Sequence, residues 1–314
     1  QKVVGAFAWV LRKFMNISGS EGLVAAGNIF MGMTESPVLI KNYLPTMNRS
    51  EIFLVMVSGM GTIAGSVMGT YIGMLGGTDP AAKVLFATHL LSASVMAVPG
   101  SIVLAKMLCP QTEEATDHVA ISGKEKENSN ILDAISSGTV TGVKLMTNIA
   151  AMLLVFISLV ALANYITEGV IGRYTGLNDW IVKITDGKAQ GLTFQFILGV
   201  ITSPFMWLIG VPSQDIMLVG SLLGQKTILN EFVAYFQLQQ WKDAGLFMYE
   251  KSILMSTYIL CGFANISSIG ILLGGLGVLA PEKRGLISRI GVPAMIGGAL
   301  VSVLSATIIG MILG

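Results

Sequence analysis

Long apolar stretches recur along most of this sequence, and they constrain its fold more than any other feature. The stretches at 51–77, 81–108 and 286–313 are each long enough for a helix to cross the hydrocarbon layer of a bilayer. Only 12% of the residues are charged, whereas about 25% are charged in a typical soluble domain. A membrane β-barrel would instead show short segments in which apolar and polar residues alternate. The sequence therefore predicts an all-α polytopic membrane protein embedded in a lipid bilayer.

Two other apolar stretches are interrupted by glycine, proline and polar residues. The first interrupted segment, 19–47, contains Pro37 and has Glu35 near its centre, and the second interrupted segment, 212–240, has Glu231 near its centre. Each is predicted to form two half-helices that meet at a polar tip, which is a re-entrant hairpin. Such a tip survives at membrane depth only where protein or a water-filled cavity surrounds it.

The order of segments in 1–108 is repeated in 190–314. Each range has an amphipathic helix, an interrupted segment, a span broken by polar residues and a plain apolar span. Between the two ranges the sequence predicts a polar loop at 109–130, a scaffold-type span within 131–168 and a connection at 169–189. Because one span separates the two repeats, the second is predicted to be inverted. Paired interrupted segments are typical of secondary transporters with a site near the bilayer midplane, whereas the repeated filter of a channel is not seen.

The remaining segments of the repeats carry their own predictions. Residues 1–16 have basic residues at the edges of an apolar face and are predicted to lie in the membrane interface, on its cytoplasmic side. The amphipathic stretch 190–210 is predicted to be broken at Pro204. The apolar stretch 250–279 is predicted to be a span broken at its polar run, CGFANISSIG.

Glu35 and Glu231 are the strongest candidates for chemistry. An ionised carboxylate near the bilayer centre is costly unless it is paired or solvated, so such a residue is a functional candidate. A structural ion pair is the alternative. An ionised carboxylate only accepts hydrogen bonds, so this pair suits a ligand with O–H or N–H donors, such as a pair of sugar hydroxyls or a base edge, and would repel a strongly anionic substrate.

Several neutral residues are candidates for binding an ion or a ring. Asn28 and Thr62 could bind a hard monovalent cation together with backbone carbonyls, or could form interhelical hydrogen bonds. Asn265 and Ser268 lie in the polar run of the broken span. Phe263 in the same run could stack on a flat ring or simply pack.

Other conspicuous residues favour structural roles. Cys109 and Cys261 have no zinc or redox spacing, so neither a structural metal nor a covalent cofactor is expected. Lys226 is expected to snorkel or to pair with a carboxylate rather than to contact a substrate. The net charge of +1 gives no sign of a nucleic-acid partner.

Three motifs resemble those of a known family. GQKTILNEFVAY at 224–235, YILCGFANISSIG at 258–270 and GNIFMGMTESP at 27–37 are similar to the signatures of the concentrative nucleoside transporters. They occur in the family's order, and the resemblance covers essentially the whole chain.

The resemblance implies a site in two parts. The nucleoside-binding residues would lie at the first tip, in the following span and in the second repeat: Gly32, Met33, Thr34 and Glu35 at the base, Val67 and Phe263 flanking it, and Glu231, Asn265 and Ser268 at the ribose. The sodium site would use two side chains and nearby backbone oxygens: Asn28 and Thr62, with Met31, Ile63 and Ser66.

The resemblance also implies a trimer in the cell (inner) membrane and three spans ahead of residue 1, so further upstream residues are expected. Met33 stands where the family commonly has Gln, and a thioether cannot both donate and accept hydrogen bonds. Base recognition is therefore expected to depend on Thr34, Glu35 and water. The sequence predicts a sodium-coupled nucleoside symporter and no enzyme; the alternatives are proton coupling, or a transporter or channel for another polyhydroxylated solute.

Overall fold

The computed structural model describes residues 2–113 and 158–314 apart from 186 and 188, with isolated positions between 132 and 155. The described residues form helices and turns, with no strand among them. The chain divides into two compact units, Gln1–His118 with Leu198–Gly314, and Val119–Ile197. Residues 114–130 of the polar loop predicted at 109–130, and just under half of the residues in the span region predicted within 131–168, lie outside the described residues.

Three of the predicted spans coincide with long apolar helical stretches. Among the described residues, 3 helical stretches are long and apolar enough to cross a membrane, Arg49–Gly76, Pro80–Leu108 and Pro281–Ile312. They match the spans predicted at 51–77, 81–108 and 286–313. The second of them, α5 (Pro80–Leu108), begins where the side chain of Asp79 accepts hydrogen bonds from two backbone N–H groups and where proline loses no helical hydrogen bond.

The two interrupted segments differ from each other. The second has two α-helices, α10 (Ile216–Ile228) and α11 (Glu231–Asp243), as predicted for its half-helices. The first has one α-helix, α2 (Gly19–Gly27), followed by turns and the short 3₁₀ helix η1 (Ser36–Ile40), so its second half is a short 3₁₀ helix with turns rather than a regular α-helix. Pro45 limits how far this segment can continue, because it has no N–H to extend a helix and disfavours helical backbone at the residue before it.

Two helices in the first unit are broken near their middle. α3 (Arg49–Gly61) and α4 (Gly65–Gly76) are separated by residues 62–64, and α12 (Glu250–Leu260) and α13 (Ile266–Leu279) by residues 261–265. The second break is the one predicted at the polar run. The breaks meet at Gly262, which has φ +142°, and where a Cβ would lie 2.9 Å from the carbonyl oxygen of Met60.

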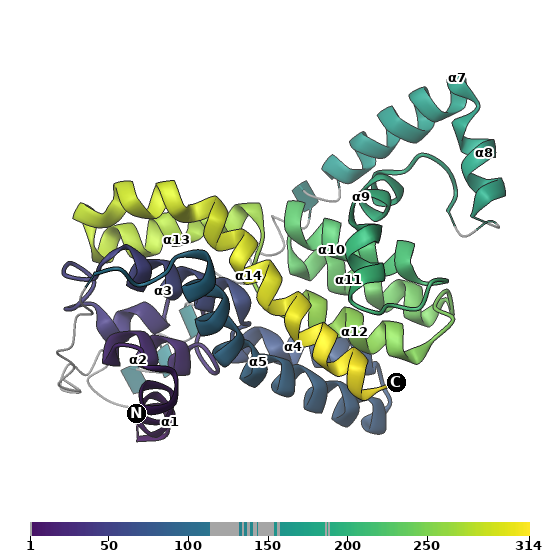
Figure 1. Cartoon of the computed structure of the whole chain (residues 1–314). Coiled ribbons are helices and arrows are strands. Elements are labelled where there is room, and N and C mark those ends of the chain that lie inside the picture. The colour runs from purple at the N-terminus through teal and green to yellow at the C-terminus, as the bar shows by residue number, and fades with distance from the viewer. Residues whose placement is uncertain are drawn as a thin grey trace. The chain divides into compact units, whose positions relative to one another are not determined.

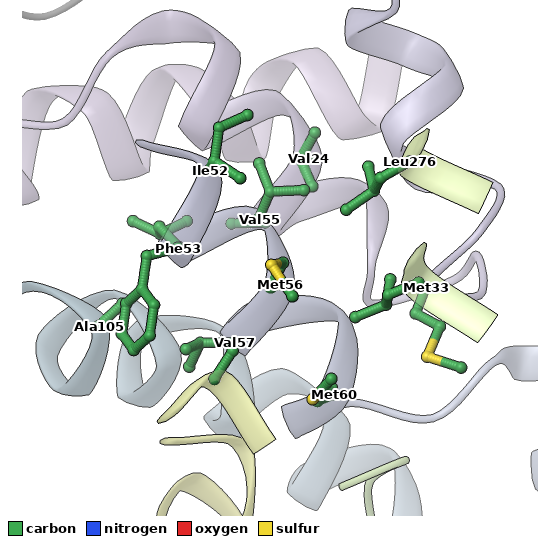
Figure 2. Packing of buried hydrophobic residues seen from close by; sticks show 14 of the residues in the cluster. Val24, Met33, Ile52, Phe53, Val55, Met56, Val57, Met60, Ala105 and Leu276 are labelled. Atoms are coloured by element: carbon green, nitrogen blue, oxygen red, sulfur yellow. The ribbon is translucent and has the colours of Figure 1, made fainter. Parts of the chain in front are cut away.

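Two clusters of buried side chains stabilise this unit. One surrounds α3, whose Ile52, Phe53 and Met56 pack with Val24 of α2 and Leu276 of α13 (Figure 2). The other joins α4 and α5 to α10, α11 and α12. The last helix, α14 (Arg284–Ile312), contacts α3, α5, α12 and α13 and runs beside them (Figure 1). Each broken helix therefore contributes one half to each cluster.

The amphipathic helices are α1 (Lys2–Met15) and α9 (Phe194–Leu208). Trp9 and Phe14 of α1 are exposed, as an interfacial helix requires. α9 continues through Pro204, so the predicted break there is wrong. In the turn before the proline, the hydroxyls of Thr202 and Ser203 donate to the carbonyls of Leu198 and Gly199.

The second unit is helical where it is described. It contains a π-helical stretch, Tyr165–Gly172, followed by α7 (Arg173–Thr175) and α8 (Leu177–Ile184). The connection predicted at 169–189 is therefore largely helical. Gly176, with φ +73°, separates α7 from α8, and a glycine adopts this left-handed conformation without steric cost.

Candidate functional site

Glu231 is a buried carboxylate at the start of a helix. It is the first residue of α11 and is 7% exposed. Its Oε1 accepts a hydrogen bond from the hydroxyl of Tyr71 at 3.3 Å, and its Oε2 accepts one from Nδ2 of Asn265 at 2.9 Å. The carboxyl group lies at the positive end of the α11 dipole. The carboxylate is thus fixed in position and keeps lone pairs for a further donor.

Asn265 connects this carboxylate to the second break. Its Oδ1 caps α13 by accepting from the backbone N–H of Ser268 at 2.9 Å, and also accepts from the hydroxyls of Ser268 at 3.0 Å and Ser267 at 2.6 Å. A single amide thereby links the start of α11 to the start of α13. The structure brings Glu231, Asn265 and Ser268 together, as the motifs predicted.

Tyr71, which donates to Glu231, belongs to a cluster of aromatic rings that no sequence motif indicated. Tyr71 of α4 stacks on Tyr235 with ring centroids 4.2 Å apart, and Phe232 lies at 6.0 Å. The hydroxyl of Tyr235 donates to the carbonyl of Thr257 at 2.8 Å. The sequence did contain one indication of its role, because Tyr71 follows the predicted site residue Val67 by four residues and so lies on the same face of the helix.

The first tip, 28–35, packs on two helices. Met33 is buried, and a Cβ on Gly59 of α3 would lie 2.9 Å from the Met33 Cβ. A Cβ on Gly275 of α13 would lie 3.2 Å from the Cγ2 of Thr34. The two glycines therefore let the tip approach α3 and α13 closely.

Glu35 does not match Glu231 in its surroundings. Its side chain is exposed, whereas that of Glu231 is buried. Its carboxylate folds back over Gly32, where any Cβ would overlap it. The two glutamates therefore occupy corresponding positions in the interrupted segments but have different environments.

The residues predicted to bind sodium form a hydrogen-bonded set. Asn28 is fully buried; its Nδ2 donates to the hydroxyl of Ser58 at 2.9 Å, and its Oδ1 accepts from the hydroxyl of Ser36 at 2.5 Å. The hydroxyl of Thr62 donates to the backbone oxygen of Ser58 at 2.9 Å. Ser58, which the sequence analysis did not single out, thus joins Asn28 to Thr62.

The donor chemistry of this set fits an alkali-metal ion. The oxygen of Thr62 donates its proton and keeps its lone pairs, and Oδ1 of Asn28 accepts one hydrogen bond of the two that it can accept. Hard cations prefer such neutral oxygens, whereas transition metals prefer imidazole or thiolate. The described part of the chain has no group of His, Cys, Asp and Glu that could hold a metal.

The other predicted ligands lie around the first break. Ile63 is buried, Met31 is half-buried and Ser66 is exposed. The carbonyl of Phe30 accepts from the backbone N–H of Gly65 at 3.2 Å. This hydrogen bond ties the first tip to the start of α4.

The two residues predicted to flank the base, and a nearby lysine, are buried or half-buried. Val67 is half-buried against the second cluster, and Phe263 packs against both clusters. Lys226 is fully buried and donates to the carbonyl of Ile259 at 2.8 Å and to the hydroxyl of Ser302 at 2.9 Å. The prediction that it snorkels or pairs with a carboxylate is wrong, because the helix break supplies uncharged oxygen acceptors instead.

Two family models match the chain. One, described as the C-terminus of the Na+ dependent nucleoside transporters, matches residues 89–310, and one described as nucleoside recognition matches residues 1–78.

Similar proteins occur in bacteria and mammals. An uncharacterized transporter of Haemophilus influenzae is 38% identical over 100% of this chain and 71% of its own length. The uncharacterized transporter YutK of Bacillus subtilis is 40% identical over 96% of this chain and 69% of its own length. Sodium/nucleoside cotransporter 1 of Rattus norvegicus is 38% identical over 99% of this chain, which spans 47% of that protein.

Solved structures are similar as well. The structure of CNTnw in an inward-facing substrate-bound state has a TM-score of 0.86 at 36% identity and is matched over 100% of this chain and 70% of that one. A CNTnw variant in an outward-facing state has a TM-score of 0.87 at 35% identity, over 99% of this chain and 69% of that one.

Proposed function

This chain belongs to the family of Na+-dependent nucleoside transporters, and from that membership we propose that it is a symporter that carries nucleosides into the cell together with sodium ions. The family transports its substrates and does not convert them, so the candidate site is a binding site. The relatives named sodium/nucleoside cotransporters support both the substrate and the ion.

The observation that carries the proposal is the geometry around Glu231. Its carboxylate is buried, is oriented by Tyr71 and Asn265, and lies beside the hydroxyl and amide groups at the start of α13. Adjacent hydroxyls of a ribose would donate to Glu231 and accept from Asn265, and charge-assisted hydrogen bonds of this kind are strong. An anionic substrate would be repelled.

The base end of the site is proposed to lie at the first tip. Thr34 touches α13 at Gly275, seven residues after Ser268, which is about 10 Å along a helix. A nucleoside lying along α13 would then bring its base to Gly32, Met33, Thr34 and Glu35, between Val67 and Phe263. Glu35 is exposed and free to turn toward a base edge, whereas Met33 is packed on α3 and offers no amide.

Sodium is favoured over the proton as the coupling ion because the predicted ion site contains no group that titrates. Asn28, Ser58, Ser36 and Thr62 are all neutral over the physiological pH range. The ion would bind between the end of α2 and the end of α3, with backbone oxygens near Met31, Ile63 and Ser66. It would thereby order the first tip before the nucleoside binds.

The proposed architecture follows the sequence repeat. Residues 1–108 and 190–314 are proposed to be inverted repeats with re-entrant segments, which move together by alternating access. This moving core is proposed to work within a homotrimer in the inner membrane. The meeting of the two breaks at Gly262 supports this reading, because inverted repeats of known transporters place their sites where discontinuous helices meet.

Uptake of labelled uridine into proteoliposomes tests the proposal and separates the alternatives. The expected result is accumulation driven by an inward sodium gradient, which a proton gradient in sodium-free buffer does not replace. Uptake driven only by protons would establish proton coupling, and equilibration without any gradient would favour a channel. Thermal protection by other polyhydroxylated solutes, but by no nucleoside, would overturn the substrate assignment.

A further inference from the structure

Lys226 is a buried cation whose hydrogen-bond acceptors are all uncharged. It is 0% exposed, and among the described residues no carboxylate forms an ion pair with it. Its ammonium group donates to the carbonyl of Ile259 and to the hydroxyl of Ser302, and that hydroxyl donates in turn to the carbonyl of Cys261 at 2.8 Å. Burying an ammonium group without compensation is costly, so the surroundings of Lys226 must supply negative potential.

The buried carboxylate of Glu231 supplies part of this potential without forming an ion pair, and the ends of two helices supply another part. The last carbonyls of a helix have no intrahelical partner and carry the negative end of its dipole. α12 ends at Leu260 and α3 ends at Gly61, and both ends face Gly262, where a Cβ would lie 2.9 Å from the oxygen of Met60 and 3.0 Å from that of Gly61. Two negative helix ends therefore converge on one point, which favours a cation there.

The first repeat has a corresponding arrangement without a lysine. Asn28 directly follows α2, the first helix of the first interrupted segment, and is connected through Ser58 to the end of α3. Lys226 lies two residues before the end of α10, the first helix of the second interrupted segment, and is connected to the end of α12. Each linkage joins an interrupted segment to the C-terminal end of the neighbouring broken helix.

We propose that Lys226 is a tethered cation, which takes at the second break the place that an exchangeable sodium ion takes at the first. Its ammonium group is covalently held at the carbonyl end of α12 and offsets the negative potential there, so that only the first break binds and releases an ion. The consequence for coupling rests on the proposed sodium symport; the role of the ammonium group at the second break does not.

Chemical rescue tests this directly. Replacing Lys226 by Ala leaves the carbonyl oxygens and Ser302 without their cation and opens space for a small one. The expected result for purified Lys226→Ala is a melting temperature at least about 5 °C higher in methylammonium chloride than in choline chloride. The matched control is Lys283→Ala, which also removes a lysine-to-carbonyl hydrogen bond, to Met47 at 2.7 Å, but not at a helix break. A response of Lys226→Ala no larger than that of Lys283→Ala would overturn the proposal.

A second variant decides the question if Lys226→Ala does not fold. Lys226→Gln keeps an N–H donor for the same oxygens but removes the charge. Uridine uptake is expected to fall at least about tenfold, because the helix ends lose their cation, and wild-type uptake by this variant would show that hydrogen bonding alone suffices. The rescue experiment needs neither sodium nor nucleoside. A wild-type protein that takes up no uridine while methylammonium still stabilises Lys226→Ala would therefore refute the proposed function and leave the tethered cation intact.

Discussion

Replacing Glu231 by Gln tests the carboxylate at the centre of the proposed site. The substitution keeps the size of the side chain and one acceptor oxygen, so the hydrogen bond from Asn265 can persist. The new NH₂ group would face the hydroxyl of Tyr71, which can rotate to accept. We therefore expect the variant to fold and to melt within a few degrees of the wild type.

The magnitude follows from the hydrogen bonds that a ribose would make. A hydrogen bond to a charged group contributes about 1.5–3 kcal/mol, whereas one between neutral groups contributes about 1 kcal/mol. The single amide oxygen of glutamine already accepts from Asn265, so it can accept from only one of the two hydroxyls, and the other loses its acceptor. The two losses together amount to roughly 3 kcal/mol. Since about 1.4 kcal/mol is tenfold in affinity, the Kd for uridine should rise about 100-fold.

Titration calorimetry with purified protein in saturating sodium measures this change. The control is Asp243→Asn, at the other end of α11, where the side chain is 55% exposed and pairs with Lys242; exposed pairs of this kind contribute little. A Kd for Glu231→Gln within threefold of that of Asp243→Asn would refute the reasoning, because it would mean that the carboxylate accepts no hydrogen bond from the substrate.

Three further substitutions test other parts of the account. Thr62→Val should weaken the apparent sodium affinity of uptake roughly tenfold and leave the uridine KM at saturating sodium unchanged; an equal effect on both would argue against an ion ligand. Tyr71→Phe keeps the stack on Tyr235 but removes the 3.3 Å hydrogen bond to Glu231, so the uridine KM should rise about fivefold, and an unchanged KM would contradict this. Gly262→Ala should lower the melting temperature by at least about 5 °C, because φ is +142° and the Cβ would meet three oxygen atoms; Gly270→Ala, with open space around it, is the control and should melt normally.

Local patterns predicted the elements of this fold well. The length of the apolar stretches gave the spans at 51–77 and 81–108, because a bilayer sets that length regardless of tertiary contacts. The polar run with its glycine predicted the break between α12 and α13, because a glycine and side chains that cap helices interrupt a helix locally. Pro204 was interpreted less successfully, because the helix accommodates it. Pro45 was not considered in the sequence, and it follows a stretch of turns and a short 3₁₀ helix.

The candidate site was only partly accessible to sequence reasoning. The motifs put Glu231, Asn265 and Ser268 together, since Asn265 and Ser268 are three residues apart and cap the same helix. Tyr71 is 160 residues from Glu231, and only the packing of α4 against α11 brings the two together. The hydrogen-bond acceptors of Lys226 were missed for a further reason: backbone carbonyls at a helix end cannot be recognised in a pattern of side chains.

Measuring sodium and uridine fluxes in the same proteoliposomes tests the central claim most directly. With sodium outside and no other gradient, addition of external uridine should accelerate the influx of radioactive sodium, and Glu231→Gln should abolish that acceleration at the same uridine concentration. Influx of uridine that leaves the sodium flux unchanged would contradict sodium-coupled nucleoside symport by this chain.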